Sequence, residues 1–371
     1  MNSVQRTVVF ENIKKYLESC HLEPVAGEKC VSENDTFQQV ALQLFRYQFE
    51  SNAPYRKLCT LRNTTPDTVR HWQDIPAVMT TSFKTAALFC GDPSTQARIV
   101  FHTSGTTRLT PGKHYMRTTE LYRLAAMRTF KWACLPDVDT LPVLVIGPTI
   151  EHFPHSSLGQ MFSWISSAFG TEDSRVCFSP TGIDFPAAVA WLHTQCAKNR
   201  PLLILATSLA LLDFFTYLQK KQMHFSLPAT SRIVDTGGYK SSNRSIERSE
   251  FLLHIGRNFG VPHEWIFNEY GMTEMSSQYY QTAVTARRFG DGVKVAPPWL
   301  RSLACDPDTL SPLAEGQLGV LRHFDLANLD SVAMLQTEDL GIVRGRTLEL
   351  LGRDPHAEPR GCSLLAEELQ N

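Results

Sequence analysis

Apolar residues recur along this chain in two patterns that predict where helices and strands lie. Two N-terminal segments, residues 10–19 and 36–50, carry apolar residues at helical spacing, and Asn34-Asp35 supplies residues suited to cap the second helix. Short apolar runs then occur at residues 99–101, 143–146, 202–205 and 233–234. Helix-like segments follow them at residues 118–133, 158–169, 208–222 and 243–259. Repeated strand–helix units predict an α/β fold with a mostly parallel sheet, covered on both faces, and with ligand loops at the strand ends.

The pattern changes from Val293 onward, where shorter strand-like pieces follow one another. They lie at residues 317–321, 332–335 and 347–350. We therefore expect four parts in the chain. They are a helical N-terminal region (1–95), an α/β core (96–292), a small β-rich subdomain (293–354) and a short C-terminal tail (355–371).

Composition excludes several classes of function. The 371 residues are 43% hydrophobic and carry a net charge of −1, with scattered lysines and arginines, which argues for a large globular chain and against nucleic-acid binding. Nine cysteines are widely spaced with no Cys-x-x-Cys pair, so we expect free thiols rather than disulfides or structural zinc. The N-terminus lacks a signal pattern, and the most apolar stretch, residues 202–215, is too short to span a bilayer. We expect a cytoplasmic protein.

A stretch rich in hydroxyl side chains follows the first predicted strand of the core. It reads Thr103-Ser104-Gly105-Thr106-Thr107 and leads through Pro111-Gly112 to Lys113. Small hydroxyls and a glycine can close around anionic oxygens, while a lysine adds a point charge, so the stretch suits phosphate binding. Six residues separate Gly105 from Gly112, whereas a Walker A loop has four, so this is not an ordinary P-loop. A solvated turn is the alternative interpretation.

A second string, Tyr270-Gly271-Met272-Thr273-Glu274, also combines residue types that suit a nucleotide. Tyr270 can stack on a base, and Gly271 allows close approach of the backbone. Thr273 can bond an α-phosphate, and Glu274 offers Mg²⁺ a hard oxygen ligand.

The two strings together resemble the hallmark motifs of the acyl-adenylate-forming superfamily, which read Thr-Ser-Gly-Thr-Thr and Tyr-Gly-x-Thr-Glu. The resemblance implies a large adenylation domain with mixed or parallel sheets flanked by helices, in which residues 96–292 bind the nucleotide and the acid. It also implies ATP and Mg²⁺ as cofactors. One departure is Arg108, which stands where the superfamily commonly has glycine.

Two further stretches fit the same resemblance. Gly237-Gly238-Tyr239-Lys240 follows the strand-like residues 233–234, and Asp339 lies in the run Thr337–Gly341. The resemblance implies that the glycine pair flanks adenine, with Tyr239 beside it, and that Asp339 binds both ribose hydroxyls. Bare backbone accommodates a flat ring, and a carboxylate accepts two hydroxyl hydrogen bonds at once. Taken alone, the glycine pair is a turn and Asp339 a loop residue.

The end of the chain resembles one family within this superfamily. In the superfamily a Gly-Arg-Asp hinge, here Gly352-Arg353-Asp354, opens a mobile C-terminal domain, whereas 17 residues follow Asp354 here, so we expect that domain to be largely missing. The string Arg360-Gly361-Cys362-Ser363-Leu364 is similar to the tails of the acyl-protein synthetases, the luciferin-component ligases of the bacterial fatty-acid reductase complex. This resemblance implies that Cys362 accepts the acyl group. Without it, a lone cysteine is usually an inert small hydrophobe.

The remaining site residues are harder to predict. The resemblance puts a gate to the acid site near residues 147–155, where His152 or His155 can approach the carboxylate; a metal bound by this pair lacks a third ligand nearby. In the superfamily a lysine of the C-terminal domain contacts the adenylate. Because we expect that domain to be largely missing, Lys113 and Lys240 are the candidates for this contact. Arg353 is a further candidate to bind the nucleotide.

The sequence therefore predicts ATP-dependent activation of a carboxylic acid, fatty or aryl, as acyl-AMP. The acyl group would then pass to a thiol such as Cys362. A free amine, a carrier protein or coenzyme A are alternative acceptors, and a reductase or carrier protein is a candidate partner. A non-catalytic nucleotide-binding scaffold subunit is the second alternative.

Overall fold

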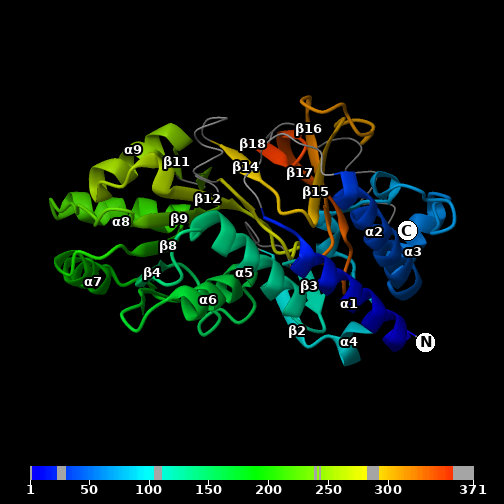
Figure 1. Ribbon diagram of the computed structural model, residues 1–371, viewed down its shortest axis with the longest axis horizontal. Coiled ribbons are helices and arrows are strands. Elements are labelled where there is room, and N and C mark those ends of the chain that lie inside the picture. Colours follow the sequence, from blue (N-terminus) through cyan, green and yellow to red (C-terminus); the bar gives the residue numbers. More distant parts are fainter. Residues whose placement is uncertain are drawn as a thin grey trace. The chain divides into compact units, whose positions relative to one another are not determined.

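The computed structural model of this chain describes residues 2–22, 31–103, 111–237, 240–241, 244–281 and 292–353 (Figure 1). These residues form two compact units, each assembled from segments far apart in the sequence. The first unit comprises Met1–Ala126, Met272–Gln278 and Val295–Asn371, and the second comprises Met127–Gly271 and Tyr279–Lys294. Within the described ranges, no helix is long and apolar enough to cross a membrane.

The second unit is built on a mixed sheet whose centre is parallel, as the alternating strands and helices predicted. Its parallel strands are β5 (Arg175–Val176), β4 (Val143–Ile146), β8 (Leu203–Thr207), β9 (Arg232–Thr236) and β12 (Ile266–Tyr270), each hydrogen-bonded to the next in this order. An antiparallel strand, β13 (Tyr279–Tyr280), pairs with β12 at Glu269 and Tyr270. Central strands of a parallel sheet are buried on both faces, which explains why they appear in the sequence as short continuous apolar runs.

Helices cover this sheet. They are α6 (Ser157–Phe169), α7 (Phe185–Ala197), α8 (Ser208–Lys220) and α9 (Arg248–Phe259). Alternate strand residues such as Leu144 and Ile204 pack in one cluster with residues of α7, α8 and α9. Their neighbours Val143 and Leu203 point to the opposite face, are also fully buried, and α6 contacts β4. The helix predicted over 243–259 begins at Arg248, because residues 244–245 pair as a strand.

The β-rich part of the first unit is an antiparallel meander. Its strands are β15 (Leu300–Cys305), β16 (Leu318–Asp325), β17 (Met334–Arg344) and β18 (Thr347–Arg353), and β1 (Val78–Met79) adds a parallel pairing to β17. The predicted strand type is confirmed here, although the strands are longer than the sequence runs suggested. The segment predicted as a strand over 332–335 begins at Met334 and extends to Arg344.

The N-terminal helices of the first unit are α1 (Asn2–Ser19), α2 (Val31–Ser51) and α3 (Ala53–Leu61). The predicted cap of the second helix is wrong: α2 begins at Val31, so Asn34-Asp35 lies inside its first turns. A polar cap does open α3, where the Asn52 side chain accepts a hydrogen bond from the Tyr55 N–H at 3.1 Å.

The remaining elements are short or lie where the chain passes between the units. They are η1 (Trp72–Asp74), η2 (Thr80–Lys84), α4 (Pro93–Gln96), β2 (Ile99–His102), β3 (Lys113–Met116), α5 (Glu120–Cys134), β6 (Phe178–Ser179), β7 (Gly182–Ile183), β10 (Lys240–Ser241), β11 (Arg244–Ser245), η3 (His263–Trp265) and β14 (Val293–Val295).

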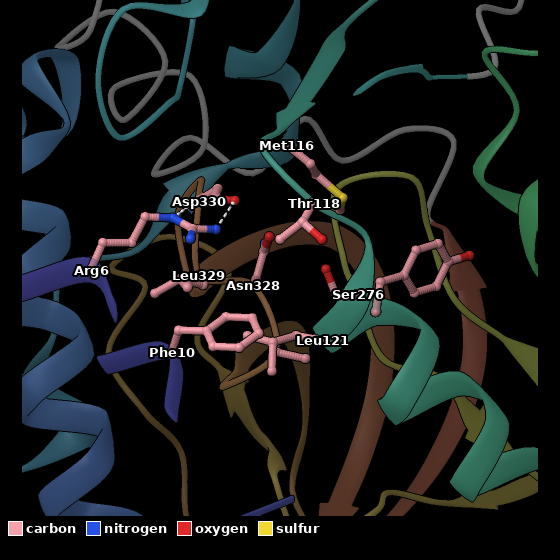
Figure 2. A pocket seen from close by; sticks show the side chains of 11 residues that line it. Arg6, Phe10, Met116, Thr118, Leu121, Ser276, Asn328, Leu329 and Asp330 are labelled. Atoms are coloured by element: carbon pink, nitrogen blue, oxygen red, sulfur yellow. Dashed lines mark hydrogen bonds and ion pairs between the residues drawn. The ribbon is translucent and has the colours of Figure 1, made fainter. Parts of the chain in front are cut away.

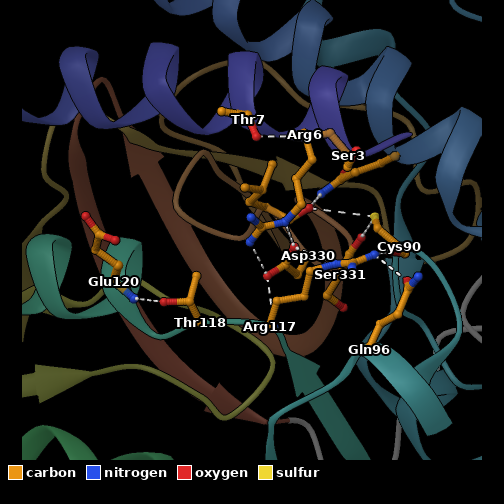
Figure 3. A network of polar contacts seen from close by, with 12 residues as sticks. Ser3, Arg6, Thr7, Cys90, Gln96, Arg117, Thr118, Glu120, Asp330 and Ser331 are labelled. Carbon is orange, nitrogen blue, oxygen red and sulfur yellow. Dashed lines mark hydrogen bonds and ion pairs between the residues drawn. The ribbon is translucent and has the colours of Figure 1, made fainter. Parts of the chain in front are cut away.

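One ion-pair network ties helix α1 to the β-rich part of the first unit (Figure 3). Asp330, 4% exposed, accepts hydrogen bonds from Arg6 at 2.7 and 2.8 Å and from the Arg117 N–H at 3.0 Å. The Arg117 guanidinium in turn donates to the Cys90 carbonyl oxygen and to the Gln96 side chain, both at 2.6 Å. Four segments distant in sequence thus meet at one buried carboxylate.

We expect Asp330→Asn to lower the stability of the protein by about 2–4 kcal/mol, because it removes the negative charge that pairs with the guanidinium groups of Arg6 and Arg117, whose Nε atoms lie 2.7 and 3.8 Å from the carboxylate. Thermal and urea unfolding of the full chain measure the change. Asp67→Asn is the matched control, since Asp67 pairs with Arg46 at 2.8 Å but is 83% exposed, and an exposed pair contributes about 0–1 kcal/mol. Equal effects of the two substitutions would show that the network does not stabilise the fold.

A small cavity lies beside this network (Figure 2). Arg6, Phe10, Thr118, Ser276 and Asn328 are among the residues that line it, and its volume is about 10 Å³. That volume admits about one water molecule. The cavity is therefore part of the packing and is too small for a substrate.

Candidate active site

The stretch predicted to bind phosphate begins and ends on a hairpin of the first unit. Strands β2 and β3 are antiparallel, with His102 opposite Lys113. The Thr103 N–H donates to the Gly112 carbonyl oxygen at 2.9 Å, and the Gly112 N–H donates to the Thr103 hydroxyl at 2.9 Å. These bonds bring both ends of the stretch together at the strand tips, while residues 104–110 lie outside the described part.

Gly112 is closely packed. A Cβ at this position would lie 3.1 Å from the Thr103 side chain and 3.2 Å from the backbone carbonyl carbon of Phe83. The Phe83 ring also packs edge-on against His114, with the centroids 5.7 Å apart. Helix η2, which ends at Lys84, is thereby fixed against the hairpin.

The same hairpin contacts the second motif through His114. Burial lowers the pKa of the His114 ring, and its Nδ1 lies 2.6 Å from the Thr273 carbonyl oxygen. Since a carbonyl oxygen only accepts, Nδ1 carries the proton and donates it. The Thr273 hydroxyl donates to the His102 carbonyl oxygen at 3.4 Å. The structure therefore brings Thr103, Lys113 and Thr273 together, although they are up to 170 residues apart.

Glu274 is the buried carboxyl group of this assembly. Desolvation raises its pKa to about 7, while the positive charges of Arg353 and Lys84 act to lower it. Its backbone carbonyl oxygen accepts a hydrogen bond from the Asn328 side chain at 2.8 Å. Beyond it, the buried Asp325 accepts from the Ser276 N–H at 2.8 Å. The segment is thus held at Glu274 and at Ser276 by the end of β16 and the loop that follows it.

Asp339 and Arg353 face each other across strands β17 and β18. The Arg353 Nε donates to the Asp339 carboxylate at 2.6 Å, and Asp339 is 8% exposed. The pairing shifts register between Leu340 and Gly341, opposite Gly352, whose φ is 94°. Such a bulge redirects the neighbouring side chains, and glycine adopts its backbone geometry without strain. Asp339 also lies close enough for its charge to raise the pKa of Glu274.

The chemistry of these side chains fits a divalent cation. Two carboxyl groups, Glu274 and Asp339, repel each other in a partly buried place, and a cation beside Glu274 would relieve the penalty of its ionisation. Mg²⁺ usually binds one or two carboxylates and takes its other ligands from substrate phosphates and water. No group of three or more metal-ligating side chains occurs among the described residues.

The second unit carries the other predicted nucleotide residues. Strand β9 ends at Thr236, and Gly237 follows with φ 89°. The Ser208 hydroxyl, at the start of α8, lies 3.3 Å from the Gly237 carbonyl oxygen and 3.0 Å from the Asp235 carboxylate. Asp235 is fully buried and also accepts hydrogen bonds from Arg248 at 3.0 Å and Asn268 at 2.8 Å. The turn at Gly237 is therefore anchored by a buried polar cluster.

A second buried acid and a buried lysine lie in the same region. Desolvation raises the pKa of Glu269 to about 7, although the Thr236 hydroxyl donates a hydrogen bond to it. Desolvation lowers the pKa of Lys294 to about 8, and the Lys294 ammonium lies 3.4 Å from the Gly292 carbonyl oxygen. The charges of Asp235 and Glu269 favour the protonated lysine, while Arg248 opposes it.

We expect Glu269→Gln to gain stability relative to the unaltered chain as pH rises from 5 to 7.5. Unfolded Glu269 ionises near its ordinary pKa of 4.5, whereas folded Glu269 keeps its proton up to about pH 7. Its contribution to stability is therefore complete below pH 4.5 and declines as pH rises toward 7. The change is on the order of 3 kcal/mol, or several degrees in unfolding temperature.

Thermal unfolding of both chains across this pH range measures the difference. Glu172→Gln is the control, because Glu172 is exposed in the same unit. A difference between Glu269→Gln and the unaltered chain that stays constant with pH would contradict a raised pKa at Glu269.

The predicted acid-site histidines lie in an exposed loop of the second unit. His152 and His155 follow Thr149, whose carbonyl oxygen accepts from the His152 and Phe153 N–H groups. The Phe153 ring lies 5.6 Å from Phe178, which lines a cavity of about 650 Å³. Phe185, Leu209 and Tyr217 contribute apolar walls to it, while Asp213, Thr216 and Lys220 are polar lining residues, and it also reaches Thr207 at the carboxyl end of β8.

The predicted site residues are divided between the two units and the part of the chain that is not described. Thr103, Lys113, Thr273, Glu274, Asp339 and Arg353 all lie in the first unit, and Gly237, Tyr270, Gly271, His152 and His155 lie in the second; Met272 is the first residue of the returning segment. Ser104, Gly105, Thr106, Thr107, Gly238, Tyr239 and Cys362 lie outside the described residues, as does the side chain of Lys240. The Tyr270 ring lies 5.6 Å from Tyr279.

Sequence reasoning missed Lys84, His114, Glu269 and Lys294. Lys84 and His114 are near their partners only through tertiary contacts, and no local pattern marks them. One signal was available for His114. It directly follows Lys113 on strand β3, and successive strand residues point to opposite faces, so an exposed Lys113 indicates a buried His114.

Comparison with solved structures identifies the fold. A crystal structure of 2-hydroxyisobutyryl-CoA ligase in the postadenylation state, in complex with 2-HIB-AMP, matches with a TM-score of 0.65 and 15% identity over 90% of this chain and 72% of that one. An open conformation of the same enzyme, in complex with 2-HIB-AMP and CoA, matches with a TM-score of 0.65 and 14% identity, over 90% and 74% of the two chains. The fold is that of the adenylate-forming ligases.

Sequence comparisons then give the family. The model of the family described as "Acyl-protein synthetase, LuxE" matches residues 28–370. The long-chain-fatty-acid–luciferin-component ligase of Vibrio harveyi is 23% identical over 331 residues, which cover 86% of this chain and 84% of the relative. Its counterpart from Aliivibrio fischeri is 21% identical over 335 residues, 87% and 85% of the two chains.

These matches define the class first: the chain is an acyl-adenylate-forming ligase, as the two motifs predicted. Within that class it belongs to the acyl-protein synthetase family, LuxE. The family membership that the sequence motifs and the tail suggested is therefore confirmed.

Proposed function

We propose that this chain activates a fatty or aryl carboxylic acid as acyl-AMP, with release of pyrophosphate, and then transfers the acyl group to the thiol of Cys362. The observation that carries the first half of the proposal is the assembly in the first unit. There Thr273 is hydrogen-bonded to the hairpin of β2 and β3, which flanks the phosphate-binding stretch on both sides. The charges of Asp339 and Arg353 shift the pKa of the neighbouring Glu274 in opposite directions.

In the adenylation step, a carboxylate oxygen of the acid attacks the α-phosphorus of ATP. The bond from that phosphorus to the oxygen bridging to the β-phosphate breaks, and pyrophosphate leaves with the electron pair. Thr103, the residues 104–107 and Lys113 hold the phosphates, and Asp339, aligned by Arg353, accepts hydrogen bonds from the ribose hydroxyls. Mg²⁺, held by Glu274, would neutralise charge on the phosphate oxygens. Lys113 and Lys240 are the proposed contacts to the adenylate.

We assign the binding of adenine and of the carboxylic acid to residues of the second unit. Gly237, Gly238, Tyr239, Tyr270 and Gly271 would bind adenine, whereas Met272 and Thr273, which belong to the first unit, would bind the α-phosphate. His152 or His155 would approach the carboxylate of the acid. The cavity of about 650 Å³ with apolar walls supports a hydrophobic acid, since pockets for ligands of this kind have volumes of roughly 300–1,000 Å³. The printed names of the two relatives, both long-chain-fatty-acid ligases, support the same choice.

In the transfer step, the thiolate of Cys362 attacks the carbonyl carbon of the acyl-adenylate. The bond to the phosphate oxygen breaks, AMP leaves, and a thioester forms. A reductase or a carrier protein that takes up this acyl group is the proposed partner. An external amine, a carrier thiol or coenzyme A is the alternative acceptor.

Acid-dependent exchange of labelled pyrophosphate into ATP tests the adenylation step directly. A panel of fatty, aryl and amino acids run with the full chain and Mg²⁺ would give the substrate class, because only an activated acid reverses to form labelled ATP. Exchange with fatty or aryl acids is expected. An absence of exchange across the whole panel would overturn the proposal and favour a nucleotide-binding scaffold subunit.

A further inference from the structure

Transfer of an adenylyl group builds negative charge on the leaving pyrophosphate, so the cations around the phosphates decide much of the rate. In the first unit, the Nε of Arg353 is already engaged by Asp339. Lys113 is exposed at the start of β3. Another positive charge that acts on Glu274 comes from a segment that no sequence motif marks.

That cation is Lys84, the last residue of η2. Two contacts fix the segment. On one side, β1 pairs in parallel with β17, with Met79 opposite Gln336, and η2 follows directly. On the other, Phe83 is 2% exposed, packs its ring on His114 and brings its backbone against Gly112. The backbone of Lys84 is therefore held beside the hairpin that carries Lys113.

The side chain of Lys84 is exposed, and its charge acts on Glu274. There it opposes the rise in the pKa of that carboxyl caused by burial. The Lys84 side chain forms no hydrogen bond or ion pair with any other described residue. An exposed lysine of this kind adds little to stability, so its substitution should leave the fold intact.

We propose that the Lys84 ammonium binds the β- and γ-phosphates of ATP beside Glu274, and stabilises the pyrophosphate as it leaves. This inference rests on the proposed function. The proposed interaction consists only of charge-assisted hydrogen bonds, so no proton or electron pair moves to or from Lys84. Lys84 would add a positive charge at the phosphates to the one that Lys113 is proposed to provide.

Calorimetric binding tests the inference without relying on turnover. The full chain, Lys84→Ala, Lys84→Arg and the control Lys57→Ala would each be titrated, with Mg²⁺, with AMP and with an ATP analogue carrying a methylene between the α- and β-phosphates. Lys57 is a matched control because it is exposed in the same unit and pairs with no other described residue. The analogue cannot be cleaved, and AMP lacks the two phosphates that Lys84 is proposed to bind.

Lys84→Ala should bind the analogue about 10- to 100-fold more weakly and AMP within about twofold of the unaltered chain. Lys84→Arg should recover most of the affinity, and Lys57→Ala should change neither. Unaltered analogue binding by Lys84→Ala would overturn the inference, and equal loss of AMP binding would show that Lys84 does not act on the outer phosphates. If the unaltered chain binds no analogue, the proposed function itself fails, and this inference fails with it.

Discussion

Glu274→Ala should abolish acid-dependent pyrophosphate exchange and leave the unfolding temperature within a few degrees of that of the unaltered chain. The proposed role of the carboxylate is to hold Mg²⁺ against the phosphates, and loss of that charge stabilisation removes several kcal/mol from the transition state, so exchange should fall at least about a thousandfold. The fold should tolerate the change, because burial already makes ionisation of Glu274 unfavourable.

Two companion variants make this result specific. Glu274→Gln keeps the shape of the side chain and removes its charge, so it should lose exchange nearly as completely as alanine does. Glu315→Ala removes an exposed carboxylate elsewhere in the same unit and should exchange normally. Near-normal exchange by either Glu274 variant would refute the assignment of this residue as the metal ligand.

The parallel strands were the most predictable part of the fold. The run predicted over 143–146 coincides with β4, and the runs at 202–205 and 233–234 lie within one to two residues of the bounds of β8 and β9. Strands buried on both faces need consecutive apolar residues, and the shortness of these runs favours strands over helices. The length of β17 was missed because its polar residues, among them Thr337 and Asp339, interrupt the apolar pattern.

The start of α2 shows the limit of local signals. Asn34-Asp35 has the composition of a cap, yet the helix begins three residues earlier, at Val31. Asparagine and aspartate favour a helix start by about 1 kcal/mol, which surrounding structure readily overrides. Helix boundaries are therefore less predictable than the presence of the helix.

The candidate site was predictable as motifs but not as contacts. Order and composition connected Thr103, Thr273 and Asp339, because each carries a side chain that suits part of a nucleotide. Nothing in the sequence indicated that His114 would donate to the Thr273 carbonyl, or that β1 would pair with β17 more than 250 residues away and carry Lys84 toward Glu274. Those contacts depend on tertiary structure, in which residues without any local signature become neighbours.

The cysteine that accepts the acyl group can also be identified by experiment. The seven described cysteines are poor candidates: six are buried, and Cys196 is half-buried. Desolvation raises the pKa of the Cys196 thiol as it does those of Cys59, Cys90, Cys134, Cys177 and Cys305. A raised pKa lowers the fraction of thiolate, which is the nucleophilic form. Cys362, outside the described residues, is the acceptor that family membership supports.

Incubation of the full chain with ATP, Mg²⁺ and a cognate acid should therefore add one acyl mass, which neutral hydroxylamine removes because it cleaves thioesters and spares amides. Cys362→Ser should keep pyrophosphate exchange and fail to retain a labelled acyl group, which separates the two half-reactions. Cys30→Ser and Cys196→Ser should both retain the label. If Cys362→Ser passed acyl groups to an external acceptor at the unaltered rate, the thioester at Cys362 would not be on the reaction path, and the acceptor would have to be an amine or a carrier thiol.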